Sequence, residues 1–185
     1  MKKYIVYSLM IGMLVWSCEK DNNADPYLIG KQQIGMLTDS TQVGELKKIF
    51  PNDSVSFSQT NNSFGNDSEI EIYSNEGKNI LTLTPLRMGD STSSISSVQI
   101  KDPSFKTAKN VSIQSTFKDI NDNYKIAKIN NLINSIVLSV PELNASFTID
   151  KKELPPNLRY DLNMKIEKSQ IPDNARIKYF MLHWD

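Results

Sequence analysis

The amino-acid sequence predicts an α+β fold, in which at least two helices pack on a mostly antiparallel sheet. The clearest sign is the hairpin of "EIEIYS" and "ILTLTP", which alternate apolar and polar residues on either side of the turn "NEGK". In this hairpin Glu69 and Glu71 are expected to face water, and Gly77 can adopt the positive φ of the turn. Two further signs are a pair of capped helical patterns and a long apolar strand at the C-terminus.

The first helical pattern lies in "TDSTQVGELKKIFP". Asp39 and Ser40 are candidates for its N-cap, and Pro51 ends it. A single apolar face is predicted for Val43, Leu46, Ile49 and Phe50. The following segment, "SVSF", alternates as a strand does.

A second helical pattern, "NVSIQSTFKDINDNYKI", resembles the first after a shift of 74 residues, from Leu46 to Ile120. The shift places like residues on one another: Thr41 on Ser115, Val43 on Phe117, Glu45 on Asp119, Leu46 on Ile120 and Phe50 on Tyr124. The pattern indicates a loose two-unit repeat. Because a match this short also arises by chance, the sequence leaves both interpretations open.

The closing segment "ARIKYFMLHW" is apolar on both faces of a strand. Ile177, Tyr179 and Met181 fall on one face, and Phe180, Leu182 and Trp184 fall on the other. A strand of this kind is expected to be covered on both sides and to lie centrally in its sheet.

The N-terminus has the pattern of a lipoprotein signal peptide. Lys2 and Lys3 precede an uncharged apolar segment from Tyr4 to Trp16, which is too short to cross a bilayer. "VWSC" then resembles the bacterial lipobox, in which the cysteine receives a diacylglycerol. The sequence therefore predicts a signal peptide over 1–17, lipid attachment at Cys18, and anchoring of the protein to the bacterial outer membrane.

Residues 18–26 are expected to form the lipidated cysteine and a flexible tether, because "EKDNNADP" is polar and ends in proline. "CEKDN" also resembles the acidic signal that sends Bacteroidota lipoproteins to the cell surface, and a plain tether explains it equally well. Residues 27–185 are predicted to form a single α+β domain. Whether that domain faces the periplasm or the exterior stays open.

Charge and cysteine content exclude several classes of protein. The chain has 21 basic and 21 acidic residues, and removal of Lys2 and Lys3 leaves 19 basic residues. This balance does not favour nucleic-acid binding. Cys18 is the only cysteine, so no disulfide is expected within the chain.

The sequence offers weak candidates for chemistry. His183 is the only histidine, so a zinc site would need carboxylates for its other ligands, and no cofactor or metal is predicted. "DINDN", Asp119 to Asn123, resembles a calcium loop, but Tyr124 and Asn130 occupy the positions that need Gly and Glu. The pairs Glu69/Glu71 and Asp119/Asp122 are expected to be solvated rather than catalytic.

Three Asp-Ser triplets, beginning at Asp39, Asp53 and Asp90, resemble the O-glycosylation signal of Bacteroidota envelope proteins. The same dipeptide is common in caps and turns. The sequence does not decide between these interpretations.

Three segments, "QIGMLTDST", "ISSVQIKDPSFKTAKNVSIQSTFKDI" and "ARIKYFMLHW", resemble the stress-sigma-factor-regulated lipoproteins of enterobacteria, a family of unknown function. The resemblance implies an α+β envelope lipoprotein and supplies no catalytic residue. The expected function is a membrane-anchored, non-catalytic binding or structural module whose partner is an envelope protein or glycan. The alternative is a carboxylate-dependent hydrolase acting on an envelope glycan, so enzymatic activity is uncertain and less favoured.

Overall fold

The computed structural model describes residues 25–62 and 65–184. Cys18, the predicted signal peptide and most of the predicted tether lie outside the described residues. Within them the protein is mostly β, with one large antiparallel sheet and one small sheet. The α+β prediction is therefore correct only in a coarse sense.

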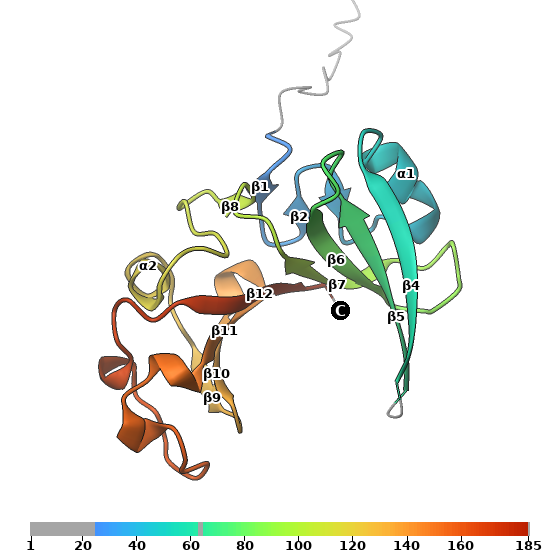
Figure 1. Ribbon diagram of the computed structural model, residues 1–185. Helices are drawn as coiled ribbons and strands as arrows, with labels where there is room; N and C mark the ends of the chain where they lie inside the picture. Colours follow the sequence, from blue (N-terminus) through green and yellow to red (C-terminus); the bar gives the residue numbers. More distant parts are fainter. Residues whose placement is uncertain (1–24, 63–64, 185) are drawn as a thin grey trace, which may run out of the picture.

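The large sheet has eight strands in the order β4-β5-β6-β7-β12-β11-β10-β9. Its first half contains β4 (Ser54–Asn62), β5 (Gly65–Tyr73), β6 (Asn79–Pro85) and β7 (Ile95–Ile100). Its second half contains β9 (Lys128–Asn131), β10 (Ser135–Val140), β11 (Ala145–Asp150) and β12 (Ile177–His183). Each half is a meander, and the antiparallel pairing of β7 with β12 joins the two (Figure 1).

The small sheet has the order β3-β2-β1-β8 and holds the start of the described chain against the segment that follows β7. Its strands are β1 (Leu28–Ile29), β2 (Gln33–Ile34), β3 (Leu37–Thr38) and β8 (Lys106–Thr107). β1 pairs in parallel with β8, so the first strand of the described chain is tied to residues near the middle of the chain (Figure 1).

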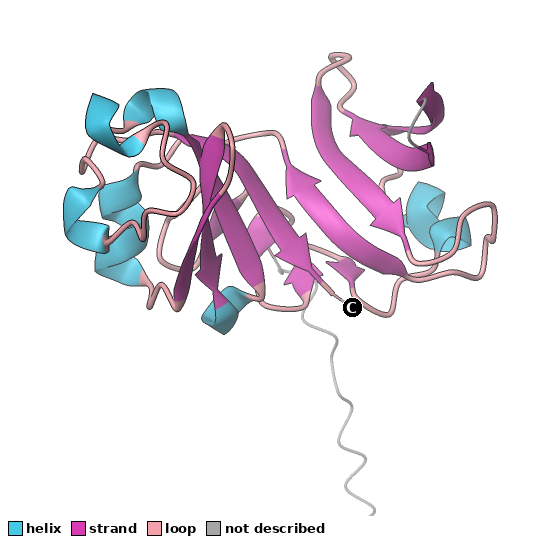
Figure 2. Cartoon of the chain, turned by 90° about the horizontal axis from the view of Figure 1, so that it is seen from below, coloured by secondary structure: helices cyan, strands magenta, loops and turns pink. Residues whose placement is uncertain are grey.

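The helical segments are shorter than predicted. Only α2 (Phe117–Asn123) exceeds one turn of α-helix in the described part of the chain, because α1 (Leu46–Ile49) has four residues and continues a 3-10 turn, η1 (Val43–Glu45). The prediction of at least two helices packed on the sheet is thus wrong for the first of them. The other 3-10 turns are η2 (Pro141–Leu143), η3 (Lys151–Glu153), η4 (Pro156–Leu158) and η5 (Lys168–Gln170). Most of the helical turns gather at one end of the molecule (Figure 2).

The N-cap of the first helical segment is not one of the two predicted residues. Asp39 and Ser40 do not cap the first helical segment, because Thr38 and Thr41 close a tight turn in which the Thr38 N–H donates to Thr41 Oγ1 over 2.9 Å. Gln42 is the N-cap residue instead, and its N–H donates to the Glu45 carboxylate over 3.0 Å.

The same contacts recur 74 residues later. The Ser112 N–H donates to Ser115 Oγ over 3.1 Å, and the Thr116 N–H donates to the Asp119 carboxylate over 2.7 Å. Leu46 and Ile120, which the shift superimposes, are both fully buried. The sequence correspondence thus extends to the hydrogen bonds that set the start of each helical segment.

The pairing of β7 with β12 is also symmetric. β12 follows β7 at an offset of 82 residues, from Gln99 to Met181, and these two residues are cross-strand partners. On either side of them, Ile100 pairs with Phe180 and Val98 pairs with Leu182. The two halves of the sheet therefore meet about a local pseudo-two-fold axis at Gln99 and Met181.

β12 lies centrally in the sheet, as predicted, but it is not covered on both sides. Phe180 and Leu182 are fully buried, whereas Tyr179 is 40% exposed and Met181 is half-buried. Ile177, the third residue predicted on that face, is buried, so the second face is open at Tyr179 and partly open at Met181. The buried face belongs to one continuous hydrophobic core that extends through both halves of the sheet.

The predicted hairpin of β5 and β6 is present. The Ser74 N–H donates to the Lys78 carbonyl over 2.9 Å, and Gly77 has a φ of 78°, which a residue with a Cβ rarely adopts. Ile70 and Ile72 are buried as expected, while Glu69 is exposed and Glu71 is half-buried.

Candidate functional site

One cleft lies in the second half and has a volume of about 770 Å³. Four cationic side chains line it, and we call it the basic cleft: Lys151, Lys152, Arg159 and Lys178. They come from η3, from the loop after η4 and from β12. One carboxylate, Asp150, also lines this cleft.

Lys151 is the most unusual residue of the basic cleft. It is only 4% exposed, and its Nζ has no hydrogen-bond partner among the described residues. Its backbone is held in place because its N–H donates to the Asn134 carbonyl over 3.0 Å. A buried ammonium group that lacks a partner is costly, so it marks a place where a ligand could supply negative charge.

Asp150 organises the polar edge of the basic cleft. One carboxylate oxygen accepts from the Lys152 N–H over 3.0 Å, and the other accepts from Lys178 Nζ over 3.1 Å. The backbone hydrogen bond from Lys152, followed by the hydrogen bond from Lys178, lowers the pKa of Asp150. The carboxylate is therefore ionised at neutral pH, and both its oxygens are engaged by these two lysines.

Arg159 is fixed by the backbone that surrounds it. Its Nε donates to the Leu154 carbonyl over 2.8 Å, and one terminal nitrogen donates to the Lys152 carbonyl over 3.1 Å. Because a guanidinium group carries five N–H donors, further donors remain for a ligand. Its two carbonyl acceptors carry no net charge, so the positive charge of Arg159 is not balanced by them.

Apolar and aromatic side chains border the basic cleft. Tyr160 is 85% exposed, Ile133 is 72% exposed and Leu162 is 49% exposed. Large exposed side chains beside a group of convergent charges are typical of a binding surface. The basic cleft thus has the chemistry to bind an anion that carries an organic group.

A second cleft, of about 620 Å³, lies in the first half near β1. Three carboxylates line it, and we call it the acidic cleft: Asp53, Glu76 and Asp102. Asp102 forms an ion pair with Lys78, which also lines the cleft. Burial raises the pKa of Asp102, but hydrogen bonds from Lys78 and from Ser104 outweigh it, so the pKa is lowered overall. This arrangement favours a carboxylate base over a protonated acid.

His183 lines neither the basic cleft nor the acidic cleft. It is half-buried at the end of β12, and its Nε2 lies 2.8 Å from Ser146 Oγ on the neighbouring strand β11. Two of the three residue types of a Ser-His-Asp triad are therefore within hydrogen-bonding distance of each other here. No carboxylate among the described residues hydrogen-bonds to this imidazole, so the third member of a triad is missing from that part of the chain.

Three of the four carboxylates that were paired from the sequence make structural contacts, and the fourth, Glu69, is exposed. Asp119 holds the start of α2, and Asp122 forms an ion pair with Lys118 over 3.0 Å. Glu71 accepts from the Tyr73 hydroxyl over 2.9 Å and from the Asn79 amide over 3.1 Å. "DINDN" thus forms most of α2, from its third residue to its last, and not a calcium loop. Among the described residues, no group of three or more His, Cys, Asp or Glu side chains is placed to hold a metal ion.

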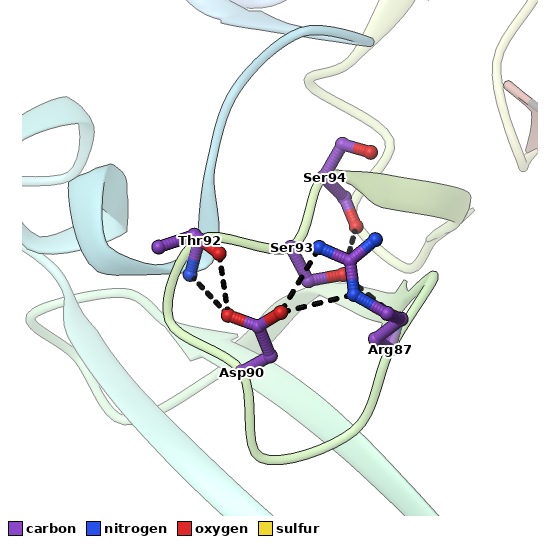
Figure 3. A network of polar contacts seen from close by, with 5 residues as sticks. All are labelled: Arg87, Asp90, Thr92, Ser93 and Ser94. Atoms are coloured by element: carbon purple, nitrogen blue, oxygen red, sulfur yellow. Dashed lines mark hydrogen bonds and ion pairs between the residues drawn. The ribbon is translucent and has the colours of Figure 1, made fainter.

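The triplet at Asp90 organises the loop between β6 and β7 (Figure 3). Asp90 accepts from the Thr92 hydroxyl over 2.6 Å, from the Thr92 N–H over 2.8 Å and from Arg87 Nε over 2.9 Å. These contacts, of which the Thr92 hydroxyl is the strongest, lower the pKa of Asp90 to about 2. The loop borders a third, mostly apolar cleft of about 470 Å³.

The middle serines of all three triplets, Ser40, Ser54 and Ser91, are exposed. They are accessible for modification, and their glycosylation stays a hypothesis. Cys18, the predicted lipidation site, lies outside the described residues. Of the helices that the structure describes, none has the length and apolar character needed to cross a membrane.

The basic cleft was missed at the level of sequence. "DKKELPPNLR" contains three of its four cations, and its two adjacent prolines disfavour both helix and strand. Such a segment is a signal for a structured, positively charged loop. Lys178 could not be assigned to this site from the sequence, because it lies on β12, far along the chain, and its ion pair with Asp150 forms only in the folded protein.

No family model matches the chain, and no curated protein matches it. Among solved structures, the chain is similar to the crystal structure of the uncharacterized protein yfeY from Escherichia coli, with a TM-score of 0.55 and 12% sequence identity. The alignment covers 84% of this chain and 98% of that chain. This agrees in part with the predicted resemblance, because the neighbour comes from an enterobacterium. At this identity the comparison establishes a shared fold alone.

Proposed function

We propose that the protein is a bacterial envelope lipoprotein whose folded domain is a non-catalytic binding or structural module. The observation that supports a binding role is the basic cleft, which brings together four cations and exposed apolar side chains. The only histidine, by contrast, lines none of the three clefts described above. The convergence of these charges in one cleft supports recognition of a charged ligand.

The anchor in this proposal is a lipid on Cys18, which holds the domain at the outer membrane through the tether. The support is the order of a basic start, an apolar segment and "VWSC". Acyl chains contribute about 0.8 kcal/mol for each CH₂ group that they bury in a bilayer. The envelope ligand would then meet the domain at the membrane surface, whichever side of the outer membrane it faces.

We expect Cys18→Ala to abolish lipid attachment, so that the chain appears as an uncleaved or soluble precursor. Metabolic labelling with an alkyne-tagged palmitate and membrane fractionation measure this. Asp21→Ala is the matched control, because it changes the tether and leaves the cysteine in place. Normal processing and membrane partition of the Cys18→Ala variant would contradict the anchor.

The alternative function is a carboxylate-dependent hydrolase acting on an envelope glycan. The acidic cleft supports it, because Asp53, Glu76 and Asp102 line a single hollow. Against it, the lowered pKa of Asp102 does not suit a general acid, whose pKa is usually raised.

A direct test is release of soluble fragments from purified peptidoglycan by the full-length protein, with Asp53→Asn and Glu76→Gln as variants. Cleavage that both variants abolish would establish the hydrolase and displace the binding module. Under the proposed function neither the protein nor a His183→Gln variant differs from a blank, and the His183→Gln change alters only stability.

A further inference from the structure

We propose that the basic cleft is a binding site for a phosphate group carried by an organic ligand. This inference rests on the proposed binding function and assigns its ligand class. It is carried by three features of the second half: a buried lysine without a partner, an excess of fixed cations, and an apolar border around a cleft of about 770 Å³.

The first feature is Lys151 at the wall of the cleft. Its side chain is buried to more than nine-tenths, and no described residue accepts a hydrogen bond from its Nζ. Taking an ammonium group out of water without a counter-charge costs several kcal/mol. The Nζ itself is covered, so a ligand anion in the cleft would offset this cost through its charge, and it would also accept a hydrogen bond once the Lys151 side chain turns toward it.

The second feature is the imbalance of charge around Lys151. The cleft has four cations and a single carboxylate, Asp150, whose two oxygens already accept from Lys178 and from the Lys152 backbone. No carboxylate of the cleft therefore remains for Lys151. The carbonyl acceptors of Arg159 leave its guanidinium charge unbalanced as well.

The chemistry of the donors selects phosphate over a single carboxylate. A phosphate monoester carries close to two negative charges at neutral pH and three acceptor oxygens. It can thus accept from an ammonium and a guanidinium group at the same time, and charge-assisted bonds of this kind are short and strong. One carboxylate would neutralise less of the charge that these residues gather.

The third feature indicates that the phosphate is attached to something larger. Sites for organic ligands have volumes of about 300 to 1,000 Å³, so this cleft is large for a bare phosphate ion. Tyr160, Ile133 and Leu162 offer exposed aromatic and aliphatic surface at its border. These side chains are suited to the organic part of the ligand, whether that part is a sugar or the glycerol and first methylene groups of a lipid.

The test uses full-length protein in dodecyl maltoside micelles, and isothermal titration calorimetry with inorganic phosphate and with glycerol 3-phosphate. We expect both probes to bind in the millimolar range or tighter, and Lys151→Met to weaken binding at least tenfold. Lys125→Met is the matched control, because it removes one positive charge from an exposed site in the same half and should bind as the unaltered protein does. Equal binding by both variants, or no binding of either probe or of the lipid below, would overturn the proposal.

Two arms separate the sources of the phosphate. Dihexanoyl phosphatidylglycerol, added below its critical micelle concentration, is compared with dihexanoyl phosphatidylcholine. Preference for phosphatidylglycerol over glycerol 3-phosphate identifies a lipid headgroup, and the reverse order identifies a free or sugar phosphate. Either result supports the proposed site, provided that the Lys151→Met change abolishes the observed preference.

A second readout distinguishes a ligand site from a structural lysine. Without phosphate, Lys151→Met should raise the melting temperature, because the uncompensated buried charge is gone and the side-chain volume is kept. A lower melting temperature together with unchanged phosphate binding would assign Lys151 a structural role and overturn the proposal.

If the variant fails to fold, Lys152→Gln is measured instead, because it alters an exposed cation of the same cleft. It should weaken phosphate binding about threefold, and unchanged binding would refute the site. None of these results depends on membrane anchoring, so failure here and failure of the Cys18 experiment are distinguishable.

Discussion

The two halves of the large sheet differ most in the segment that connects their third and fourth strands. In the first half, β6 and β7 are joined by residues 86–94, a loop closed by Arg87 and Asp90 (Figure 3). In the second half, β11 and β12 are joined by residues 151–176, which form η3, η4 and η5. The longer connection builds the basic cleft. The comparison teaches that a shared framework can acquire a binding surface through the length of one connection.

The framework itself is closely matched between the halves. Val43 donates its N–H to the Ser93 carbonyl over 2.9 Å, and Phe117 donates to the Ala175 carbonyl over 2.8 Å. In both halves the first residue of the helical segment is thereby hydrogen-bonded to the residue two positions before the last strand. These contacts hold the start of the helical segment against β7 in one half and β12 in the other.

The largest effect is expected at the junction of the halves. Phe180 is fully buried, pairs with Ile100 of the first half and stacks on Phe147 with ring centroids 4.3 Å apart. Phe180→Ala should lower the free energy of unfolding by about 3–5 kcal/mol, measured by urea denaturation. Tyr179→Ala, at the exposed neighbour, should cost about 1 kcal/mol or less.

Hydrogen exchange of the Phe180→Ala variant tests whether the halves are one domain. If they are, amide protection falls in β5 and β6 as well as in β10 and β11. A loss confined to the second half would show that the halves are separate domains, and the predicted single domain over 27–185 would be wrong.

A smaller effect separates the two helix starts. Asp119 accepts from both the N–H and the hydroxyl of Thr116, whereas Glu45 accepts only from the Gln42 N–H. Asp119→Ala should therefore cost about 1–2 kcal/mol and Glu45→Ala about 0.5–1 kcal/mol. The same urea denaturation measures both. Equal costs, or a larger cost for Glu45→Ala, would refute this ranking.

The smallest effect concerns the short connection at low pH. The Thr92 hydroxyl and Arg87 hold the pKa of Asp90 at about 2, against about 3.9 for an unfolded aspartate. The unfolded chain thus binds more protons between these values, so the stabilisation is complete above about pH 4 and is lost as the pH falls toward 2.

Asp90→Asn should flatten the dependence of melting temperature on pH in this window. Asp39→Asn removes the same charge in the same half at a side chain without a hydrogen bond to the described residues, and it is the control. An unchanged slope for Asp90→Asn would show that the network does not survive in solution.

Sequence reasoning predicted the strands better than the helices. The hairpin of β5 and β6 followed from alternation and Gly77, and the central place of β12 followed from its apolar pattern. The reason given for that place was wrong, because the face of Tyr179 and Met181 is open. The first helix was overestimated, because its apolar spacing is equally compatible with a 3-10 turn and one α-turn, and tertiary contacts decided its length.

The candidate site was not predictable from the composition. The chain has equal numbers of basic and acidic residues, so its net charge conceals the local excess in the basic cleft. That excess arises because β12 brings Lys178 beside Asp150, and because the backbone around η3 buries Lys151. Neither the contact of Lys178 with Asp150 nor the burial of Lys151 produces a periodic pattern in the sequence. Sequence reasoning did place His183 correctly at the end of a strand, although its contact with Ser146 could not be foreseen.

The pairing of β7 with β12 has a consequence for the rate of folding. The other strand pairs of the large sheet form between successive strands, whereas this pair joins residues 100 and 180. Closing a long loop costs more entropy than closing a short one, and non-local pairing slows folding. We therefore expect each meander to assemble early and the junction at Gln99 and Met181 to form late. Until then both meanders expose a strand edge, and the folding chain is most exposed to aggregation during that interval.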